Sequence, residues 1–313
     1  MNARHHPSSA HAVGRRLALA CAVTALVLVL EIAGGLFTHS LALLSDAGHV
    51  FGDLFALALS AYALKLAQTP PDRIRTFGYH RAEVFAALVN GVSLIAIAIG
   101  IVFEAWHRLT AAAPTPVQAG TMSGVAAIGL LANVGIFFLL RGPAADSLNV
   151  RSAVAHVIGD LLASVAVVGG GLTMWATGYY LLDPILSLAV MVLILRSAGR
   201  ILGESLHILL EGIPPGLELG QVERAIHDVR GVRGVHDLHI WSLCSDYCAL
   251  SAHVLIAEQT TSEARQIVDQ VAQMLEERFR IVHTTLQAES EACADACVPD
   301  GNGAALCAHE PGH

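Results

Sequence analysis

Two pairs of ionisable residues interrupt apolar stretches of this sequence. His49 and Asp53 lie four residues apart in one stretch, and His156 and Asp160 are spaced the same way in another. Residues four apart share one face of a helix, with Cβ atoms roughly 6 Å apart. Two such helices facing each other would present two imidazoles and two carboxylates. Four protein ligands of these types are what a closed, tetrahedral zinc site uses.

This ligand set favours a transition-metal site. One pair alone could equally be a hydrogen-bonded polar contact between helices. Two carboxylates brought together in a low-dielectric interior, however, are unfavourable unless they share a cation. Imidazole suits zinc, copper, nickel and iron, whereas carboxylate and water suit magnesium and calcium. Zinc fits best, and cadmium, cobalt and nickel stay open as alternatives.

Two further acidic residues stand in apolar stretches. Asp46 lies one turn before His49 on the same helix face, so we expect it to be a candidate for proton coupling. Burial would shift its titration upward, toward the range in which His49 and His156 titrate. Glu31 has no partner at a matching spacing, and we expect it only to line a water-filled cavity.

The elements that must position these residues are membrane spans. The chain is 54% hydrophobic and only 14% charged, whereas soluble proteins carry roughly a quarter charged residues. A span needs about 20 apolar residues and must be helical to satisfy its backbone. Six stretches qualify: about 17–37, 41–66, 82–107, 119–141, 152–177 and 180–202. The sequence therefore predicts an all-α six-helix transmembrane bundle over 15–208, preceded by a tail over 1–14.

Basic residues predict the orientation of the bundle. Most basic residues fall in the connections on one side of the predicted bundle, and the connections on the other side hold only Arg108. The side with most basic residues is therefore expected to be cytoplasmic. Both termini are then cytoplasmic. The protein itself is expected in the inner (plasma) membrane if the source is bacterial. No basic excess suggests a nucleic-acid partner. The residues of the basic set are Arg4, Arg15, Arg16, Lys65, Arg73, Arg75, Arg81, Arg141, Arg151, Arg196 and Arg200.

The polar last third predicts a small cytoplasmic α+β domain over 209–290. Its patterns indicate the order α-β-β-α-β. The predicted elements are a helix over 217–229, strands over 235–243 and 247–257, a helix over 262–280 and a strand over 281–289. Residues 291–313 are rich in Ala, Gly, Cys and His, and we expect a flexible tail.

Several motifs resemble those of the zinc-transporting branch of the cation diffusion facilitator family. They match in order over about residues 15–290, so the resemblance is specific. The motifs are Ser40–His49 continuing to Asp53, Phe77–Glu83 followed by Asn90-Gly91, Asp183-Pro184, Leu210–Gly212 and Val235–Trp241.

The resemblance implies a dimeric zinc/proton antiporter with a metallochaperone-like cytoplasmic domain. It carries the transport ligands onto His49, Asp53, His156 and Asp160, with Zn²⁺ and H⁺ as the ions moved and no prosthetic group. It also implies a regulatory or structural zinc site in the cytoplasmic domain. The residues implied there are His236, His253, His283 and Glu289, with Cys293 and Cys297 of the tail as further ligands.

Two other function classes are weighed against export. An intramembrane metalloenzyme would keep one zinc position open and carry a separate base, yet the sequence offers four matched ligands and no His-Glu-x-x-His motif. A membrane-anchored metal sensor would not need ionisable pairs in two spans. The sequence therefore predicts efflux of zinc from the cytoplasm.

Overall fold

The structure is a computed structural model that describes residues 7–112, 115–140, 148–244 and 247–290. Within helices, the side chains of 7–18, 64, 139–140 and 148–159 lie outside that description. The chain divides into two compact units. The first comprises the helices up to Tyr62 together with Ala86–Leu202, and the second comprises Ala63–Phe85 and the chain from Gly203 onward.

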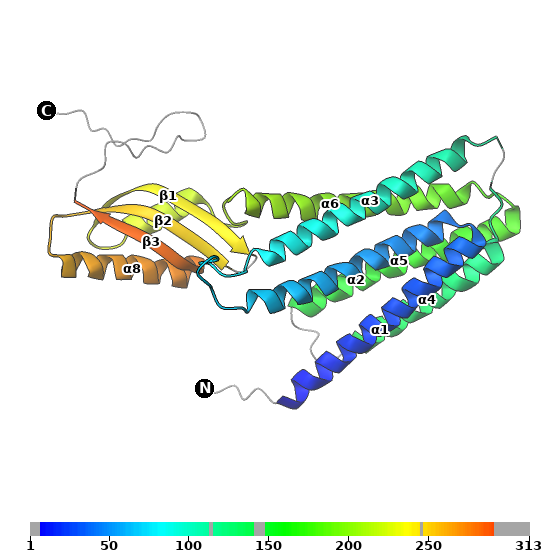
Figure 1. Ribbon diagram of the computed structural model, residues 1–313, viewed down its shortest axis with the longest axis horizontal. Helices are drawn as coiled ribbons and strands as arrows, with labels where there is room; N and C mark the ends of the chain where they lie inside the picture. Colours follow the sequence, from blue (N-terminus) through cyan, green and yellow to red (C-terminus); the bar gives the residue numbers. More distant parts are fainter. Residues whose placement is uncertain (1–6, 113–114, 141–147, 245–246, 291–313) are drawn as a thin grey trace. The chain divides into compact units, whose positions relative to one another are not determined.

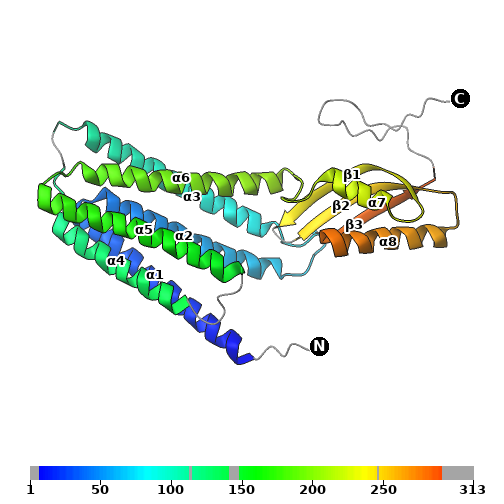
Figure 2. The same cartoon turned by 180° about the vertical axis from the view of Figure 1, so that it is seen from behind.

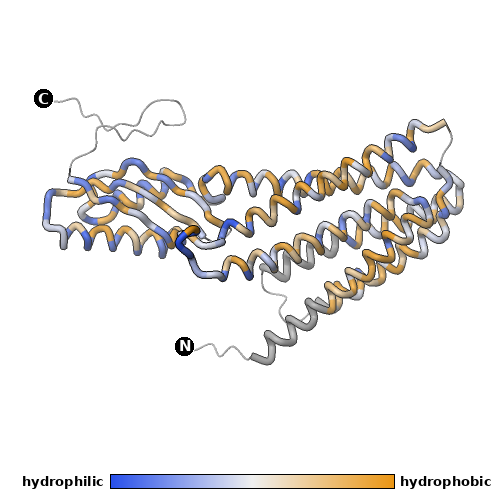
Figure 3. Tube along the Cα trace, viewed as in Figure 1, coloured by the Kyte–Doolittle hydropathy of each residue, from blue (hydrophilic) through white to orange (hydrophobic). Residues whose placement is uncertain are grey.

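The first unit is a bundle of long apolar helices. Six helices among the described residues are long and apolar enough to cross a membrane, which confirms the predicted six spans. Figure 3 shows the apolar character along most of their length. They are α1 (Pro7–Thr38), α2 (Leu41–Ala67), α3 (Ala82–Thr110), α4 (Ala119–Leu140), α5 (Leu148–Thr177) and α6 (Leu182–Leu209).

Two buried clusters hold the bundle together. Leu43 of α2 packs with Met122 of α4 and Val167 of α5, while α3 and α6 meet through Leu94, Ala98 and Met191. Helix α1 lies beside α4, and α3 lies beside α6, in both views (Figures 1 and 2). Helices α2 and α5, which carry the predicted ligands, therefore share a common core with α4.

The second unit contains the predicted small α+β domain. Its elements are α7 (Leu219–His227), β1 (Val232–Cys244), β2 (Tyr247–Ile256), α8 (Thr261–Phe279) and β3 (Ile281–Glu289). The order α-β-β-α-β confirms the predicted fold class. In the sheet order β1-β2-β3, the first pair is antiparallel and the second parallel.

Both helices of this domain cover the same face of the sheet. Ile226 of α7 and Leu275 of α8 join one apolar core with Leu250 and Val254 of β2. Because side chains alternate along a strand, His253 lies on the opposite face. The side-chain alternation of a regular strand is interrupted in β1, since a register shift falls between His236 and His239 and Asp237 adopts a positive φ of 51°. Asp is among the few residues that tolerate this conformation.

Candidate metal centres

One candidate centre lies between α2 and α5. Nε2 of His49 is 3.1 Å from Oδ1 of Asp160 and 3.8 Å from Oδ2 of Asp53. The potential ligand atoms of these three residues all lie within 4.8 Å of one another. The structure thus brings together a histidine and two carboxylates from helices that are more than 100 residues apart in sequence.

These spacings suit a small divalent cation. A tetrahedral zinc bonded at about 2.0–2.2 Å places its ligand atoms roughly 3.4 Å apart. The two separations at His49 bracket this value. All three side chains are partly exposed, at 28% for His49, 38% for Asp53 and 19% for Asp160, so an ion could reach them.

The fourth predicted ligand, His156, belongs to α5, one turn before Asp160. Its side chain lies outside the described residues. Asp46 and Glu31 are both buried, at 3% and 1% exposure. Oε2 of Glu31 makes no hydrogen bond to any described residue. The sequence led us to expect that Glu31 lines a water-filled cavity. The bundle instead encloses its side chain.

The start of α2 is fixed by a residue distant in sequence. Asp183, at the beginning of α6, is fully buried. Its carboxylate accepts hydrogen bonds from Oγ of Ser40 at 2.6 Å and from the backbone N–H groups of Leu41 and Ala42 at 2.7 and 3.1 Å. Arg108 adds an ion pair at 3.5 Å. A carboxylate at a helix N-terminus satisfies unpaired N–H groups and favours the helix dipole.

Asp183 was missed as a positioning residue by sequence reasoning. The sequence analysis includes it only as part of an Asp-Pro motif, because a cap supplied from 141 to 143 residues away leaves no local signal. A buried Asp at the start of a span is the signal that could have pointed to it, since such a group must find partners.

Helix α2 also approaches α3 closely beside the ligands. A Cβ on Gly52 would lie 2.3 Å from Cδ2 of Leu94, which is closer than two carbon atoms can pack. Glycine at this position therefore allows α3 to support the turn of α2 that carries Asp53.

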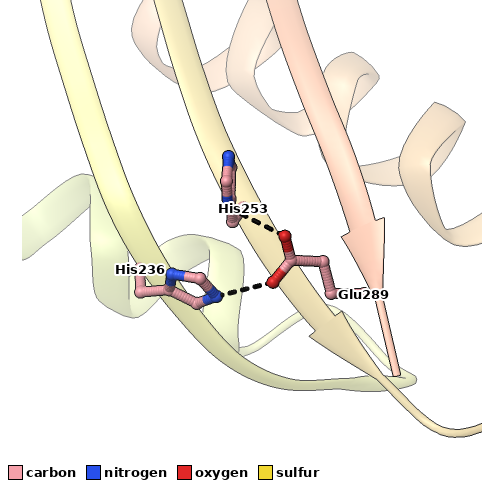
Figure 4. Close-up of side chains that lie close together, drawn as sticks. All are labelled: His236, His253 and Glu289. Carbon is pink, nitrogen blue, oxygen red and sulfur yellow. Dashed lines mark hydrogen bonds and ion pairs between the residues drawn. The ribbon is translucent and has the colours of Figure 1, made fainter. Parts of the chain in front are cut away.

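A second candidate centre lies on the face of the β1-β2-β3 sheet opposite α7 and α8 (Figure 4). Nε2 of His236 is 2.9 Å from Oε2 of Glu289, and Nδ1 of His253 is 2.9 Å from Oε1 of the same carboxylate. Although close to Glu289, the buried Nδ1 of His253 makes no hydrogen bond to any described residue. The potential ligand atoms of the three residues lie within 4.8 Å of one another.

Strand pairing explains this grouping. His236 and His253 are direct neighbours across β1 and β2, and Glu289 pairs with Leu255, two residues along β2. Residues two apart on a strand share a face. Two imidazoles beside one shared carboxylate are suited to a metal such as zinc.

The structure does not bring His283 to this group. His283 precedes Glu289 by six residues on the same strand, which corresponds to roughly 20 Å at about 3.3 Å per residue. It instead contacts Phe77, at 5.2 Å between ring centroids, and faces Tyr247 at 6.5 Å. Cys293 and Cys297 lie outside the described residues.

Comparison with known proteins adds an independent view of the chain. A model of the cation efflux transmembrane domain matches residues 17–210, and one of the cation efflux protein cytoplasmic domain matches residues 214–291. The zinc transporter ZitB of Escherichia coli K12 is 40% identical over 281 residues, covering 89% of this chain and 88% of that protein.

Two other relatives cover similar shares. The metal cation efflux system protein CzcD of Cupriavidus metallidurans is 37% identical over 90% of this chain and 88% of its own length. The cadmium, cobalt and zinc/H⁺-K⁺ antiporter of Bacillus subtilis is 37% identical over 85% of each chain. A solved structure of the metal-bound C-terminal domain of CzcD covers 23% of this chain and 99% of that one, with 37% identity and a TM-score of 0.22.

Proposed function

Because this chain belongs to the cation diffusion facilitator family, we propose that it exports zinc by exchange for protons through the centre between α2 and α5. The protein is a metal-cation efflux transporter in the membrane and not an enzyme.

The observation that carries the proposal is the convergence of His49, Asp53 and Asp160. An imidazole and two carboxylates within 4.8 Å of one another form a set that zinc accepts. Cadmium and cobalt, named for a close relative, would share it because affinity alone separates these ions poorly. We assign His156 as the fourth ligand from its spacing, since it precedes Asp160 by one helical turn.

The same ligands can hold either metal or protons. Zinc binds neutral imidazole and ionised carboxylate, so its arrival displaces protons from any ligand that carries one. Asp46, buried one turn before His49, is the proposed additional proton carrier. Proton return would then accompany metal exit, with both termini of the chain in the cytoplasm.

Metal flux into sealed vesicles tests this function. Purified protein in liposomes loaded with a zinc-sensitive dye should accumulate zinc in proportion to time. The His49→Ala, Asp53→Ala, His156→Ala and Asp160→Ala variants should each lose more than the roughly 10- to 100-fold that removal of a supporting partner costs. Asp269→Ala is the control, because Asp269 is an exposed residue of α8.

The outcome separates this proposal from its rivals. A membrane-anchored sensor or an intramembrane enzyme would show no time-dependent accumulation. Wild-type flux in any one of the four variants, with normal expression, would remove that residue from the ligand set.

We further propose that the group His236, His253 and Glu289 binds a regulatory zinc and that the protein works as a homodimer. Three ligands leave one tetrahedral position for a water or for a residue outside the described part. Binding only to the folded, associated form would convert metal affinity into association. His283 is left out of this site because of its distance along β3.

The matched test compares two histidines of one strand. Full-length His236→Ala should lose zinc-dependent dimerisation in analytical ultracentrifugation. His239→Ala should keep it, because His239 is 52% exposed and pairs with Asp237 instead. A dimer constant that ignores zinc in the wild type would refute this role.

A further inference from the structure

A large cavity lies inside the second unit, apart from both metal centres. Its volume is about 1090 Å³, and every residue that lines it belongs to that unit. The walls come from the connection between α2 and α3, from the segment after α6 and from β1. Ligand pockets commonly enclose about 300–1,000 Å³, so this cavity is large enough for a sizeable small molecule.

One part of the wall is apolar and includes the ends of two spans. Leu66 of α2 and Phe85 of α3 line it together with Ile74 and Phe77 of the connection. Ile74 is 85% exposed and Phe77 is 43% exposed. Clustered apolar side chains at the mouth of a cavity mark a surface that an apolar group can cover.

The connection holds Ile74 outward by a fixed turn. Oδ1 of Asp72 accepts hydrogen bonds from the backbone N–H groups of Ile74 and Arg75, at 2.7 and 2.6 Å. These bonds lower the pKa of Asp72, so the turn is stable at neutral pH. The exposure of Ile74 is thus imposed by the local fold.

Another part of the wall is cationic. Arg75 and Arg81 both line the cavity. Arg81 donates to Oε1 of Glu211 at 2.9 Å, which offsets its charge. Arg75 stacks over the ring of Tyr79, with Cζ 4.7 Å from the ring centroid, and donates to its hydroxyl at 3.2 Å. Arg75 is therefore held in place. Among the described residues no carboxylate forms an ion pair with it, although Asp72 of the same turn lies near enough to interact with its charge.

We propose that this cavity binds an anionic phospholipid, with its phosphate at Arg75 and an acyl chain along Leu66, Ile74 and Phe85. Arginine matches phosphate geometry through paired N–H donors. A basic pocket at the cytoplasmic ends of spans is where an anionic headgroup would lie. The apolar wall favours a lipid over a soluble phosphate, which would leave that wall uncovered. The site is independent of the proposed metal transport.

The test uses two arginines of the same connection. Binding of dihexanoyl phosphatidylglycerol to the purified full-length protein would be measured by native mass spectrometry. Arg75→Gln should weaken binding about tenfold, as expected for one charge-assisted contact. Arg73→Gln removes the same charge from the same connection but from a residue that does not line the cavity, so it should leave binding unchanged.

Two further arms identify the ligand class. Ile74→Ser, at an exposed position that folding does not depend on, should weaken the lipid but not glycerol phosphate. Equal losses for Arg75→Gln and Arg73→Gln would show only diffuse surface attraction and overturn the proposal. So would equal affinity for glycerol phosphate, equal affinity for dihexanoyl phosphatidylcholine, or no binding of any of the three probes.

Discussion

His49 is the proposed ligand that brings a nitrogen donor to the centre between α2 and α5. One of its ring nitrogens faces carboxylates from both α2 and α5, at 3.8 and 3.1 Å. In the group of His49, Asp53 and Asp160, the histidine supplies the nitrogen donor and the two carboxylates supply oxygen donors. We therefore expect His49 to contribute most to the choice of ion.

Replacing His49 by Asp should change selectivity. The change substitutes a harder oxygen for the imidazole nitrogen and adds negative charge, so preference for zinc over manganese and other harder ions should fall by about tenfold. Competition assays in liposomes, with manganese and cadmium added to a fixed zinc concentration, measure the effect. Unchanged competition in this variant would count against His49 as the selecting ligand.

The sequence allowed this group to be predicted because helical spacing is local. His49 and Asp53 share a face by periodicity alone, and the same rule applies to Asp160. The placing of His283 has the opposite origin. Which residue of β3 lies beside His253 depends on the pairing register, and the register is set by contacts with β2 that no local pattern reveals.

At the scale of elements, α2 depends on a cap from another helix. Asp183→Asn would keep one acceptor oxygen but place an amide donor against the backbone N–H of either Leu41 or Ala42. We expect a loss of about 1–3 kcal/mol of unfolding free energy. Thermal unfolding of the metal-free protein in detergent measures it.

The control and the functional readout for this cap use neighbouring groups. Glu104→Gln removes the other carboxylate that contacts Arg108, and that carboxylate is 44% exposed, so stability should change little. If Asp183 positions α2, Asp183→Asn should also raise the KM for zinc more than it lowers the maximal rate. An unaltered KM with reduced stability would limit Asp183 to a structural role.

The start of α8 gives a pH-dependent prediction. Thr260 and Glu263 form a capping box, in which Oε2 of Glu263 accepts from the backbone N–H and hydroxyl of Thr260. These bonds lower the pKa of Glu263 below its ordinary 4.5. The stabilisation is therefore complete above that value and is lost as pH falls through the lowered pKa. Hydrogen exchange should show the first turn of α8 losing protection in that acidic range.

A substitution checks the origin of this effect. Glu263→Gln keeps an acceptor but removes the charge, so the first turn should lose its pH dependence while keeping part of its protection. Glu277→Gln, which changes an exposed residue near the end of the same helix, should leave the pH dependence intact.

Most helices and strands could be predicted from the sequence. Continuous apolar stretches predict spans, and turn residues separate them, which is why six helices were expected. The helix ends were less accurate: α6 runs to Leu209, beyond the predicted 202. Hydropathy reports the apolar part of a helix, whereas backbone hydrogen bonding continues through the more polar residues that follow it.

At the scale of the whole molecule, the need for a coupled ion follows from the energetics of export. Moving one charge against 100 mV costs about 2.3 kcal/mol, so exporting Zn²⁺ alone would cost about 4.6 kcal/mol. Each returning proton recovers about 2.3 kcal/mol, in addition to any pH gradient. Exchange at the proposed centre would accomplish this without a second pathway, because ligands that bind zinc would release the protons they held.

Zinc flux into inverted vesicles should therefore rise when the lumen is acidified and collapse when a protonophore is added. Acidification supplies protons to the side from which they return, and the protonophore removes both the potential and the pH gradient. Asp46→Asn should weaken the response to lumen pH more than it weakens zinc binding, since Asp46 is buried beside the ligands and lies outside the three-residue group. Flux that ignored both treatments would show an uncoupled pathway, and the exchange mechanism would have to be abandoned even if His49, Asp53 and Asp160 proved to bind zinc.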